Sequence, residues 1–473
     1  MSFAIASKNF HNHARTTNGM KAYKSALNSA VDFFYNAGAL RGRSAECIAL
    51  FDKVVKDEPE LALRLSQWLR DVRGGAGERD LFRSLLTHME TTYPNLLLDT
   101  GLLKNIPEVG RWDDLLVFNT LLVRNEAFTI ISEALRSGNG LAAKWMPRKG
   151  VTAVELRNYM ALSPKAYRKM LVGLTKVVES QMCAKEWDSI EFSHVPSKAM
   201  SIYSKAFARN ATNSFENYKL ALSRNDGTAK VNAAAVYPYE VVKMARTGDP
   251  VVADAMWDAL PNYVGDANVM AICDVSGSMS CPAGGYENRS KTTCLEVSVS
   301  LGMYTASKNT GPFKDTFMTF AGKPEIHHLS GTLGARVAQM DSAGSDWGTN
   351  TNLEAAFDRI LAVAIKAKLP ASDMPKLLLV LSDMQFDQCS SFDKNAYNMI
   401  QYQYESAGYT IPTIVWWNLN SSGNTPATVN DANVALVSGF SPAILKAVLS
   451  GDLEGITPEN IMMKAIMSDR YKV

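Results

Sequence analysis

The chain has 473 residues, of which 47% are hydrophobic and 20% are charged, and its formal net charge at pH 7 is +2. These values are typical of a folded globular protein, and the length predicts two or three domains. Because no apolar run reaches the roughly 18–20 residues that span a bilayer, we expect no membrane partner. The N-terminal stretch lacks the pattern of a signal peptide, which favours a cytoplasmic protein.

The small net charge hides an asymmetry along the chain. Residues 1–260 carry 34 Lys and Arg against 27 Asp and Glu, and the remainder carries 15 against 20. The most basic window, residues 140–230, holds 15 positive and 7 negative residues. This surplus is compatible with a polyanionic partner for the first half, although a basic solvated face is also common.

Helix after helix is predicted over residues 20–255. Apolar residues recur at helical spacing, and the breaks carry Gly, Pro, Asn or Ser-Pro. A new helix is expected at Pro59, because proline suits the first turn. The clearest segments are residues 44–73, 77–94, 111–122, 125–140, 163–182 and 197–210. Many short helices joined by short breaks predict a HEAT-like helical-repeat domain over residues 1–258.

One glycine-rich segment, "RDVRGGAGERD" at residues 70–80, looks superficially like a phosphate-binding loop. It lacks the preceding strand and the Gly-Lys-Ser/Thr ending of a Walker site. We therefore expect a link between two helices, in which the three glycines supply unusual backbone angles. A phosphate contact by Arg73 and Arg79 is the weaker alternative, since arginines are usually solvated.

The second half, residues 259–473, alternates strands with helices. Strands are predicted at residues 268–276, 313–322, 324–331, 375–384, 409–420 and 433–439, and helices at 294–309, 351–367 and 441–451. The strands 268–276 and 375–384 are continuous apolar runs, which is typical of strands covered on both faces. The pattern predicts a doubly wound, Rossmann-like α/β domain with a parallel sheet.

Oxygen-bearing side chains follow two of the predicted strands. Asp274, Ser276 and Ser278 follow the first as D-x-S-x-S, and Asp383 follows "LLLVLS". Ligands of open α/β sheets bind beyond the carboxyl ends of the strands. Carboxylate and hydroxyl oxygens, without a His or Cys cluster, favour Mg²⁺, Mn²⁺ or Ca²⁺ over zinc. An incompletely filled shell would let a protein partner supply an acidic oxygen to the metal.

This arrangement resembles the metal-ion-dependent adhesion site (MIDAS) of von Willebrand A domains, in which a D-x-S-x-S loop, a distant Thr and a distant Asp hold the metal. The resemblance implies that the metal ligands are Asp274, Ser276, Ser278, Thr351 and Asp383. Thr351 is preferred to Thr349 because "TNLEAAF" fits the family pattern of a Thr before a helix. Met384 stands where the family often has Gly. The alternative is that Asp274 caps a helix and the serines fill a turn.

Catalysis is not expected. Phosphatases with an aspartyl nucleophile resemble D-x-D at a strand end, and their second Asp is the general acid. Here Ser276 occupies that position, and nothing replaces the proton donor. No Ser–His pair is evident, and His327 and His328 are expected to be surface or packed imidazoles. Six scattered cysteines form no C-x-x-C pair, which predicts free thiols in a reducing compartment.

The pairing of a helical-repeat region with an A domain resembles the Ro family, whose helical part is called TROVE. The resemblance is carried by stretches such as "RDVRGGAGERDLFR", "IPEVGRWDDLL" and "WGTNTNLEAAF", which are closest to a relative of that family. It implies a helical ring closed by the A domain. It also implies binding of structured small RNA outside the ring and of single-stranded ends of misfolded RNA in its hole, as a ribonucleoprotein.

Basic residues beside aromatics give local support for RNA binding, because cations contact phosphates and aromatics stack on unpaired bases. The candidate RNA contacts are Lys144, Arg148, Lys149, Lys165, Arg168, Lys169, Lys198, Lys205 and Arg209. The neighbouring Trp145, Tyr167, Tyr203 and Phe207 are more often core residues at such spacing. The sequence is therefore compatible with two functions. One is a non-catalytic RNA-binding protein with a metal adhesion site, and the other is an interaction or assembly protein without nucleic acid.

Overall fold

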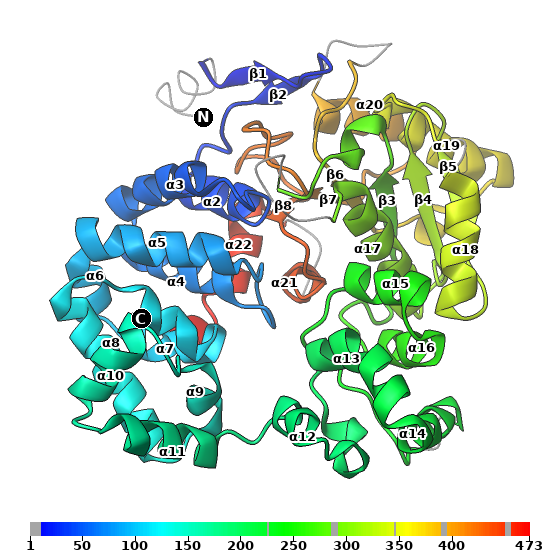
Figure 1. The fold of residues 1–473 in the computed structure, drawn as a ribbon. Helices are drawn as coiled ribbons and strands as arrows, with labels where there is room; N and C mark the ends of the chain where they lie inside the picture. The colour runs from blue at the N-terminus through cyan, green and yellow to red at the C-terminus, as the bar shows by residue number, and fades with distance from the viewer. Residues whose placement is uncertain (1–10, 225–226, 285–291, 345–346, 389–394, 450–455) are drawn as a thin grey trace.

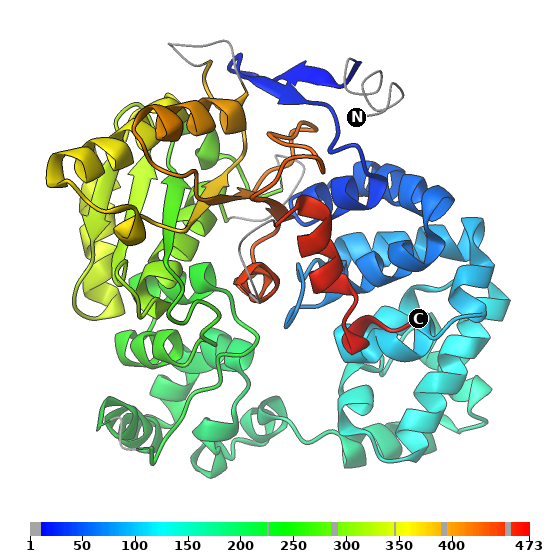
Figure 2. The same ribbon diagram turned by 180° about the vertical axis from the view of Figure 1, so that it is seen from behind.

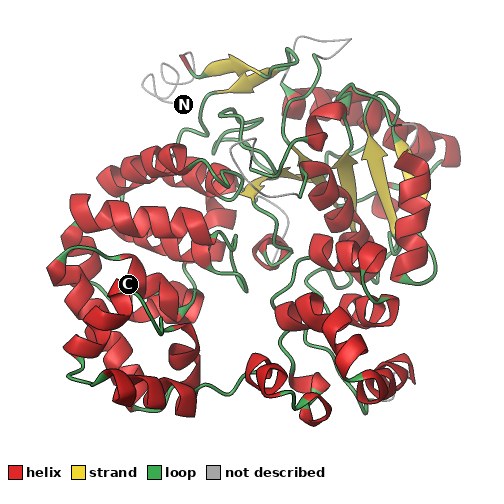
Figure 3. Cartoon of the chain, viewed as in Figure 1, coloured by secondary structure: helices red, strands yellow, loops and turns green. Residues whose placement is uncertain are grey.

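The computed structural model describes residues 11–224, 227–284, 292–344, 347–388, 395–449 and 456–473. Helices of the first half form an arc, and the strands gather in the second half, apart from one small hairpin (Figures 1 and 3). The expected class, a helical N-terminal region followed by a Rossmann-like α/β domain, is confirmed. Among the described residues, no helix combines the length and the apolar character needed to cross a membrane.

The arc is built from short helices with clear start signals. Proline lies in the first turn of α4, α6, α11, α15 and α16, where its missing N–H is not needed. The predicted start at Pro59 is confirmed. The helices are α2 (Ser29–Ala37), α3 (Ser44–Asp57), α4 (Pro59–Arg70), α5 (Arg79–Thr92), α6 (Pro94–Leu98), α7 (Leu102–Val109), α8 (Leu121–Arg136), α9 (Gly140–Trp145), α10 (Val151–Tyr159), α11 (Pro164–Leu174), α12 (Val178–Ala184), α13 (Ser197–Asn210), α14 (Thr212–Arg224), α15 (Pro238–Thr247) and α16 (Pro250–Asp258).

The α/β domain contains a sheet of six strands in the order β5-β4-β3-β6-β7-β8, in which only the edge strand β5 is antiparallel. Every residue of β3, β6, β7 and β8 is buried, which explains their uninterrupted apolar sequences. The strands are β3 (Val269–Asp274), β4 (Thr316–Phe320), β5 (Glu325–His328), β6 (Leu377–Ser382), β7 (Thr413–Asn418) and β8 (Val434–Ser438).

Six helices accompany the sheet. They are α17 (Cys294–Lys308), α18 (Leu333–Ala343), α19 (Leu353–Ala367), α20 (Ala396–Ser406), α21 (Ile444–Leu449) and α22 (Pro458–Ile466). The helices predicted at residues 294–309 and 351–367 are confirmed as α17 and α19. The helix predicted at 441–451 appears as α21, and its last two predicted residues, 450 and 451, lie outside the described residues. No prediction was made for α18, α20 or α22.

The helical arc starts and ends on the α/β domain. At its start, α2 packs against β7 and β8, and at its end α15 packs against α17 and α18. The C-terminal α22 packs against α2 and α4, as the view from behind shows (Figure 2). The residue pattern left open whether the helical part closes on itself, whereas the resemblance implied a ring. The structure forms a ring in which the α/β domain joins the two ends of the arc (Figure 1).

Two terminal segments reinforce this closure. Strands β1 (His13–Arg15) and β2 (Lys21–Tyr23) form an antiparallel hairpin, which the sequence analysis did not predict. The hairpin contacts the α/β domain, where Thr16 Oγ1 donates to the carbonyl of Phe386 at 2.7 Å. At the other terminus, Tyr471 donates to Asp71 Oδ2 at 3.0 Å. Each end of the chain therefore packs on the half that is distant in sequence.

Candidate functional site

The candidate metal site lies where two adjacent parallel strands end. Strand β3 ends at Asp274, and β6 ends at Ser382 immediately before Asp383. These strands are direct neighbours, with Cys273 paired to Leu381. Their carboxyl ends therefore meet at one edge of the sheet, as the sequence predicted.

Hydrogen bonds connect the two strand ends into one cluster. Ser382 Oγ donates to Asp274 Oδ2 at 2.5 Å, and the Ser276 amide donates to Asp274 Oδ1 at 3.0 Å. The hydroxyls of Ser276 and Ser278 lie 3.2 Å apart. The Ser278 side chain also lies close enough to the Asp383 carboxylate to oppose the rise in its pKa. Four of the five predicted metal ligands are therefore in one connected group.

Thr351 lies in the loop before α19, which passes beside this cluster at Gly277. The Thr351 amide donates to Asp387 Oδ2 at 2.8 Å, and the Asp387 amide donates back to the Thr351 carbonyl at 3.0 Å. Two residues earlier, Thr349 lies beside Gly277. Its Cγ2 atom is 3.6 Å from the position that a Cβ atom on Gly277 would occupy. Thr351 is only 1% exposed, and its hydroxyl has no hydrogen-bond partner among the described residues. A buried hydroxyl without a partner is unfavourable unless a ligand satisfies it.

The two carboxylates are in electrostatic conflict. Burial, and next the negative charge of Asp383, raise the pKa of Asp274 to about 7. Burial also raises the pKa of Asp383, although hydrogen bonds from Ser278 and the Gln385 amide oppose this shift. In the part of the chain that the structure describes, neither carboxylate forms an ion pair with Lys or Arg. A bound cation would remove this conflict.

The donor set fits a hard cation. Among the described residues, no group of three or more His, Cys, Asp and Glu side chains is suited to hold a metal. The set at this edge would instead be two carboxylates and three hydroxyls, which are oxygen ligands of the kind that Mg²⁺ accepts. Asp274, Ser276 and Asp383 are buried, whereas Ser278 is exposed. The site therefore opens to solvent on the Ser278 side, where an external oxygen has access.

Met384 shows why glycine suits the position after the last Asp. Its backbone has a φ of 64°, in the left-handed region that glycine adopts without steric cost. The Met384 amide donates to Ser382 Oγ at 2.9 Å, so the turn keeps Ser382 aligned with Asp274. Methionine therefore adopts the turn that a glycine would favour, and the side chain is fully packed in the core.

The two histidines of the α/β domain lie at the sheet edge. His327 Nε2 lies 2.7 Å from Thr319 Oγ1, and His328 Nδ1 lies 3.0 Å from Thr316 Oγ1. Both bonds join β5 to its neighbour β4. The imidazoles therefore pair with threonines of the adjacent strand, as packed or surface histidines do.

The candidate RNA contacts are only partly brought together. Arg148, Lys149 and Arg168 line one pocket of about 140 Å³, to which Arg157 also contributes. None of these four forms an ion pair among the described residues, and no acidic side chain lines the pocket. Arg157 was not among the predicted contacts. It lies on α10, and the sequence gave no signal that it lines the same pocket.

The other candidates are dispersed. Lys165 and Lys169 are exposed on α11, and Lys205 and Arg209 are exposed on α13. Lys198 forms an ion pair with Glu240, and Lys144 lies 4.0 Å from Glu179. Of the neighbouring aromatics, Tyr167 and Phe207 are buried in the core. Trp145 is half-buried, and the Arg111 guanidinium lies 3.9 Å from the centre of its ring.

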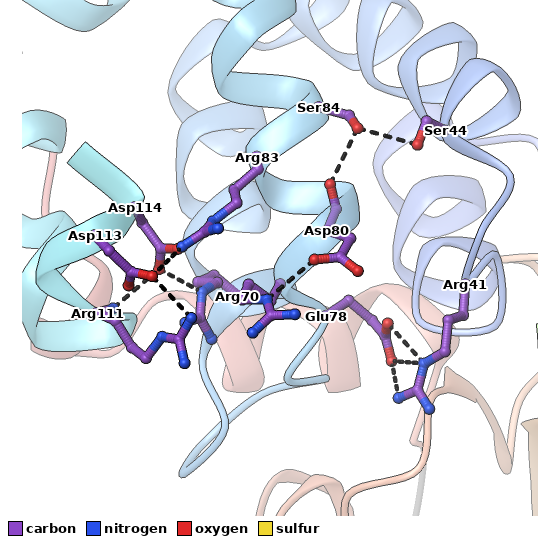
Figure 4. A network of polar contacts seen from close by, with 11 residues as sticks. Arg41, Ser44, Arg70, Glu78, Asp80, Arg83, Ser84, Arg111, Asp113 and Asp114 are labelled. Carbon is purple, nitrogen blue, oxygen red and sulfur yellow. Dashed lines mark hydrogen bonds and ion pairs between the residues drawn. The ribbon is translucent and has the colours of Figure 1, made fainter. Parts of the chain in front are cut away.

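The stretches "RDVRGGAGERDLFR" and "IPEVGRWDDLL" meet in a network of ion pairs (Figure 4). Buried Asp114 accepts from Arg70 Nε at 2.8 Å and from Arg83 Nε at 2.6 Å. Arg111 donates to Asp113 at 2.9 Å. Arg79, the candidate phosphate contact, pairs with Asp80 at 3.0 Å on the surface.

The glycine-rich loop links α4 to α5, as expected, rather than following a strand. Gly77 has a φ of 76°, and a Cβ there would lie 1.8 Å from the Tyr237 hydroxyl oxygen. A Cβ on Gly75 would lie 1.9 Å from the Trp68 carbonyl oxygen. Only Gly77 needs the left-handed conformation, and Gly75 is required for close packing. The loop between α4 and α5 therefore lies against Tyr237, the residue that precedes α15.

Together these features define a protein with a helical ring closed by a Rossmann-like α/β domain, with clustered oxygen ligands at the carboxyl edge of its sheet. Two family models match the chain, both described as domains of unknown function: DUF2828 over residues 128–264 and DUF7788 over residues 268–470. The chain is also similar to Uncharacterized protein L728 of Acanthamoeba polyphaga mimivirus. The two are 29% identical over an alignment of 499 positions, which covers 92% of this chain and 84% of the relative.

Proposed function

We propose that the α/β domain is a von Willebrand A-like domain that holds a divalent cation, with Mg²⁺ as the first candidate and Mn²⁺ or Ca²⁺ as substitutes. Its ligands are Asp274, Ser276, Ser278, Thr351 and Asp383. The observation that carries this proposal is the buried pair of carboxylates, Asp274 and Asp383, together with a buried Thr351 hydroxyl that has no partner among the described residues. Without a cation, the carboxylate pair and the Thr351 hydroxyl each lower the stability of the fold. One divalent ion would satisfy both.

Each residue has a separate task in this site. Asp274 and Asp383 supply the negative charge, and Ser382 and the Ser276 amide fix the orientation of the Asp274 carboxylate. Asp387 fixes the backbone of Thr351, so that its hydroxyl is placed without a hydrogen bond of its own. When bound, the cation supplies an electrophilic centre that accepts one more oxygen ligand. Exposed Ser278 marks the side from which an acidic partner residue completes the shell.

The proposed activity is binding without catalysis. No proton donor stands at Ser276, and the nearby hydroxyls of Ser276 and Ser278 bond to each other. A group that cannot transfer a proton to a leaving atom gives no general acid catalysis. The proposed role of the cation is therefore adhesion to a carboxylate of a protein partner.

Magnesium titration calorimetry tests this proposal directly. We expect one Mg²⁺ site in protein stripped with a chelator, and loss of this binding in Asp274→Ala. The matched control is Asp431→Ala, which removes another carboxylate of the same domain that is bonded to the Thr428 amide. Unchanged Mg²⁺ affinity in Asp274→Ala would reject the ligand assignment.

RNA binding by the helical part is a second proposal, in which the protein is Ro-like. It is supported by the closed ring and by the pocket of Arg148, Lys149, Arg157 and Arg168, four cations without an acidic partner. Clustered cations repel each other, and phosphates would relieve this repulsion. The ligand would be small or misfolded RNA with a single-stranded segment.

A fluorescent single-stranded oligoribonucleotide separates the RNA proposal from the interaction-protein alternative. RNA binding predicts an affinity that falls linearly with the logarithm of salt concentration, with a slope of roughly −0.7 per phosphate contacted. The alternative predicts no salt-dependent RNA binding and recovery of a protein partner only when Mg²⁺ is present. A protein captured with Mg²⁺ but not with chelator, from cells treated with ribonuclease, would favour adhesion alone.

A further inference from the structure

Two cysteines face each other beside the candidate metal site. Cys281 follows the short 3-10 helix Gly277–Ser280, and Cys294 is the first residue of α17. The Cys294 amide donates to the Cys281 carbonyl at 3.1 Å, and Pro282 pairs with Thr293 in the antiparallel sense. The two cysteines are therefore directly opposite in this register. Their sulfur atoms are 3.7 Å apart.

This geometry is close to that of a disulfide. Directly opposite residues of a hydrogen-bonded antiparallel pair have Cα atoms about 5.5 Å apart, within the range of about 4.4–6.8 Å that disulfides use. The sulfur atoms need to approach to about 2.05 Å, which side-chain rotation and a small backbone shift provide. Both residues are free thiols in the structure.

The two thiols differ in their surroundings. Cys281 is 8% exposed, and the Asn420 side-chain amide donates to its sulfur at 3.4 Å. Cys294 is fully buried, and its thiol lies 3.5 Å from the Leu419 carbonyl oxygen. Cys281 is therefore the more accessible of the two to an oxidant from solvent.

We propose that Cys281 and Cys294 form a reversible disulfide under peroxide, and that this bond weakens cation binding at the neighbouring site. Cys281 first gives up its proton. Its thiolate attacks one peroxide oxygen, the O–O bond breaks, and the released hydroxide takes up that proton, so that Cys281 sulfenic acid and one water form. The Cys294 sulfur then attacks the Cys281 sulfur, the S–O bond breaks, and the leaving hydroxide takes the Cys294 thiol proton as a second water. In total, two thiols lose two protons and two electrons, and one hydrogen peroxide becomes two waters.

The coupling to the metal loop runs through the backbone. The Cys281 amide donates to the carbonyl of Ser278, a proposed ligand, at 3.1 Å, and the Met279 amide donates to the Ser276 carbonyl at 3.1 Å. Movement of Cys281 toward Cys294 therefore pulls on the turn that places both serine hydroxyls. Mg²⁺ requires near-ideal octahedral geometry, so a small ligand displacement lowers its affinity. The effect of the disulfide on Mg²⁺ affinity rests on the proposed cation site, whereas formation of the disulfide does not.

The test treats the full-length protein with hydrogen peroxide and maps its peptides without reduction. We expect a peptide that joins Cys281 to Cys294, and four remaining thiols of the original six. Dithiothreitol should restore all six. In calorimetry, the oxidised protein should bind Mg²⁺ at least tenfold more weakly than the reduced protein.

Two variants make the outcome decisive. Cys281→Ser should form no linked peptide, and its Mg²⁺ affinity should not respond to peroxide. Cys183→Ser removes an exposed cysteine elsewhere and should leave both responses intact. Absence of the linked peptide in the wild type overturns the proposal. If the linked protein forms but its Mg²⁺ affinity stays within twofold of that of the reduced form, the proposed effect of the disulfide on Mg²⁺ binding is overturned. If the reduced protein binds no Mg²⁺, the cation proposal fails, and the linked peptide alone decides the disulfide.

Discussion

Replacing Asp274 by Asn should stabilise the metal-free protein and remove its response to Mg²⁺. Asn retains the shape of Asp and one acceptor oxygen, but it carries no charge. In the native fold Asp274 is fully buried beside Asp383, and its pKa is raised to about 7 from an ordinary value of 3.8. The charged carboxylate therefore opposes folding whenever no cation is bound.

The sign and size of this change in stability follow from the linkage between proton binding and folding. A raised carboxyl pKa means that the folded state binds the proton more tightly, so this contribution to stability is present below about pH 4 and is lost as the pH rises through about 7. The shift of about three pKa units, at 1.36 kcal/mol each, corresponds to a cost of up to about 4 kcal/mol above pH 7. The altered bond to Ser382 offsets roughly 1 kcal/mol of this. We expect a net gain of about 2–3 kcal/mol for the variant.

Denaturant unfolding at pH 8, in chelator and in excess Mg²⁺, measures both effects. The wild type should gain about 2.7 kcal/mol when Mg²⁺ is at a hundred times its Kd, and Asp274→Asn should gain nothing. Asp32→Asn is the matched control, because Asp32 also has a pKa raised first of all by burial but lies in α2 and bonds to Ser25. The reasoning is refuted if Asp274→Asn lowers stability in chelator, or if Mg²⁺ still stabilises it.

Three further predictions follow from other contacts. Asp387→Ala should weaken Mg²⁺ binding roughly tenfold in calorimetry, because it frees the Thr351 backbone without removing a ligand; equal affinity would exclude this positioning role. The double variant Arg148→Glu with Arg168→Glu should weaken binding of a single-stranded oligoribonucleotide at least tenfold and flatten its salt dependence, and an unchanged slope would place the RNA elsewhere. Asp114→Ala should cost about 3–5 kcal/mol in denaturant unfolding, since it leaves two paired arginines without their buried partner; a cost below 1 kcal/mol would contradict this.

The sheet and the oxygen-bearing side chains at its carboxyl edge could be predicted because local sequence determines them. Continuous apolar runs such as Leu377–Ser382 occur where a strand is covered on both faces, and an acid directly after such a run marks its carboxyl end. The preference for Thr351 came from a family pattern. The structure adds a physical reason, in that its hydroxyl is buried and lacks a partner.

Closure of the ring could not be read from the sequence, because it depends on contacts between residues hundreds of positions apart. Thr16 bonds to Phe386, and Asp71 bonds to Tyr471, without any local pattern that announces either pair. The arrangement of the basic residues could not be predicted from the sequence either. Arg148 and Arg168 converge because α11 packs against α9, the helix just before Arg148. Lys198, in contrast, is paired with Glu240 from another helix. Charge counts along a chain do not reveal which cations have partners.

The central claim is that oxygen ligands from three loops hold one divalent cation. Crystals soaked in Mn²⁺ test it most directly, because manganese gives an anomalous diffraction peak at its own position. The account predicts one strong peak at roughly 2 Å from the hydroxyl oxygens of Ser276 and Ser278, with Asp274, Asp383 and Thr351 around it. A peak at another place, or no peak at saturating Mn²⁺, would contradict the account.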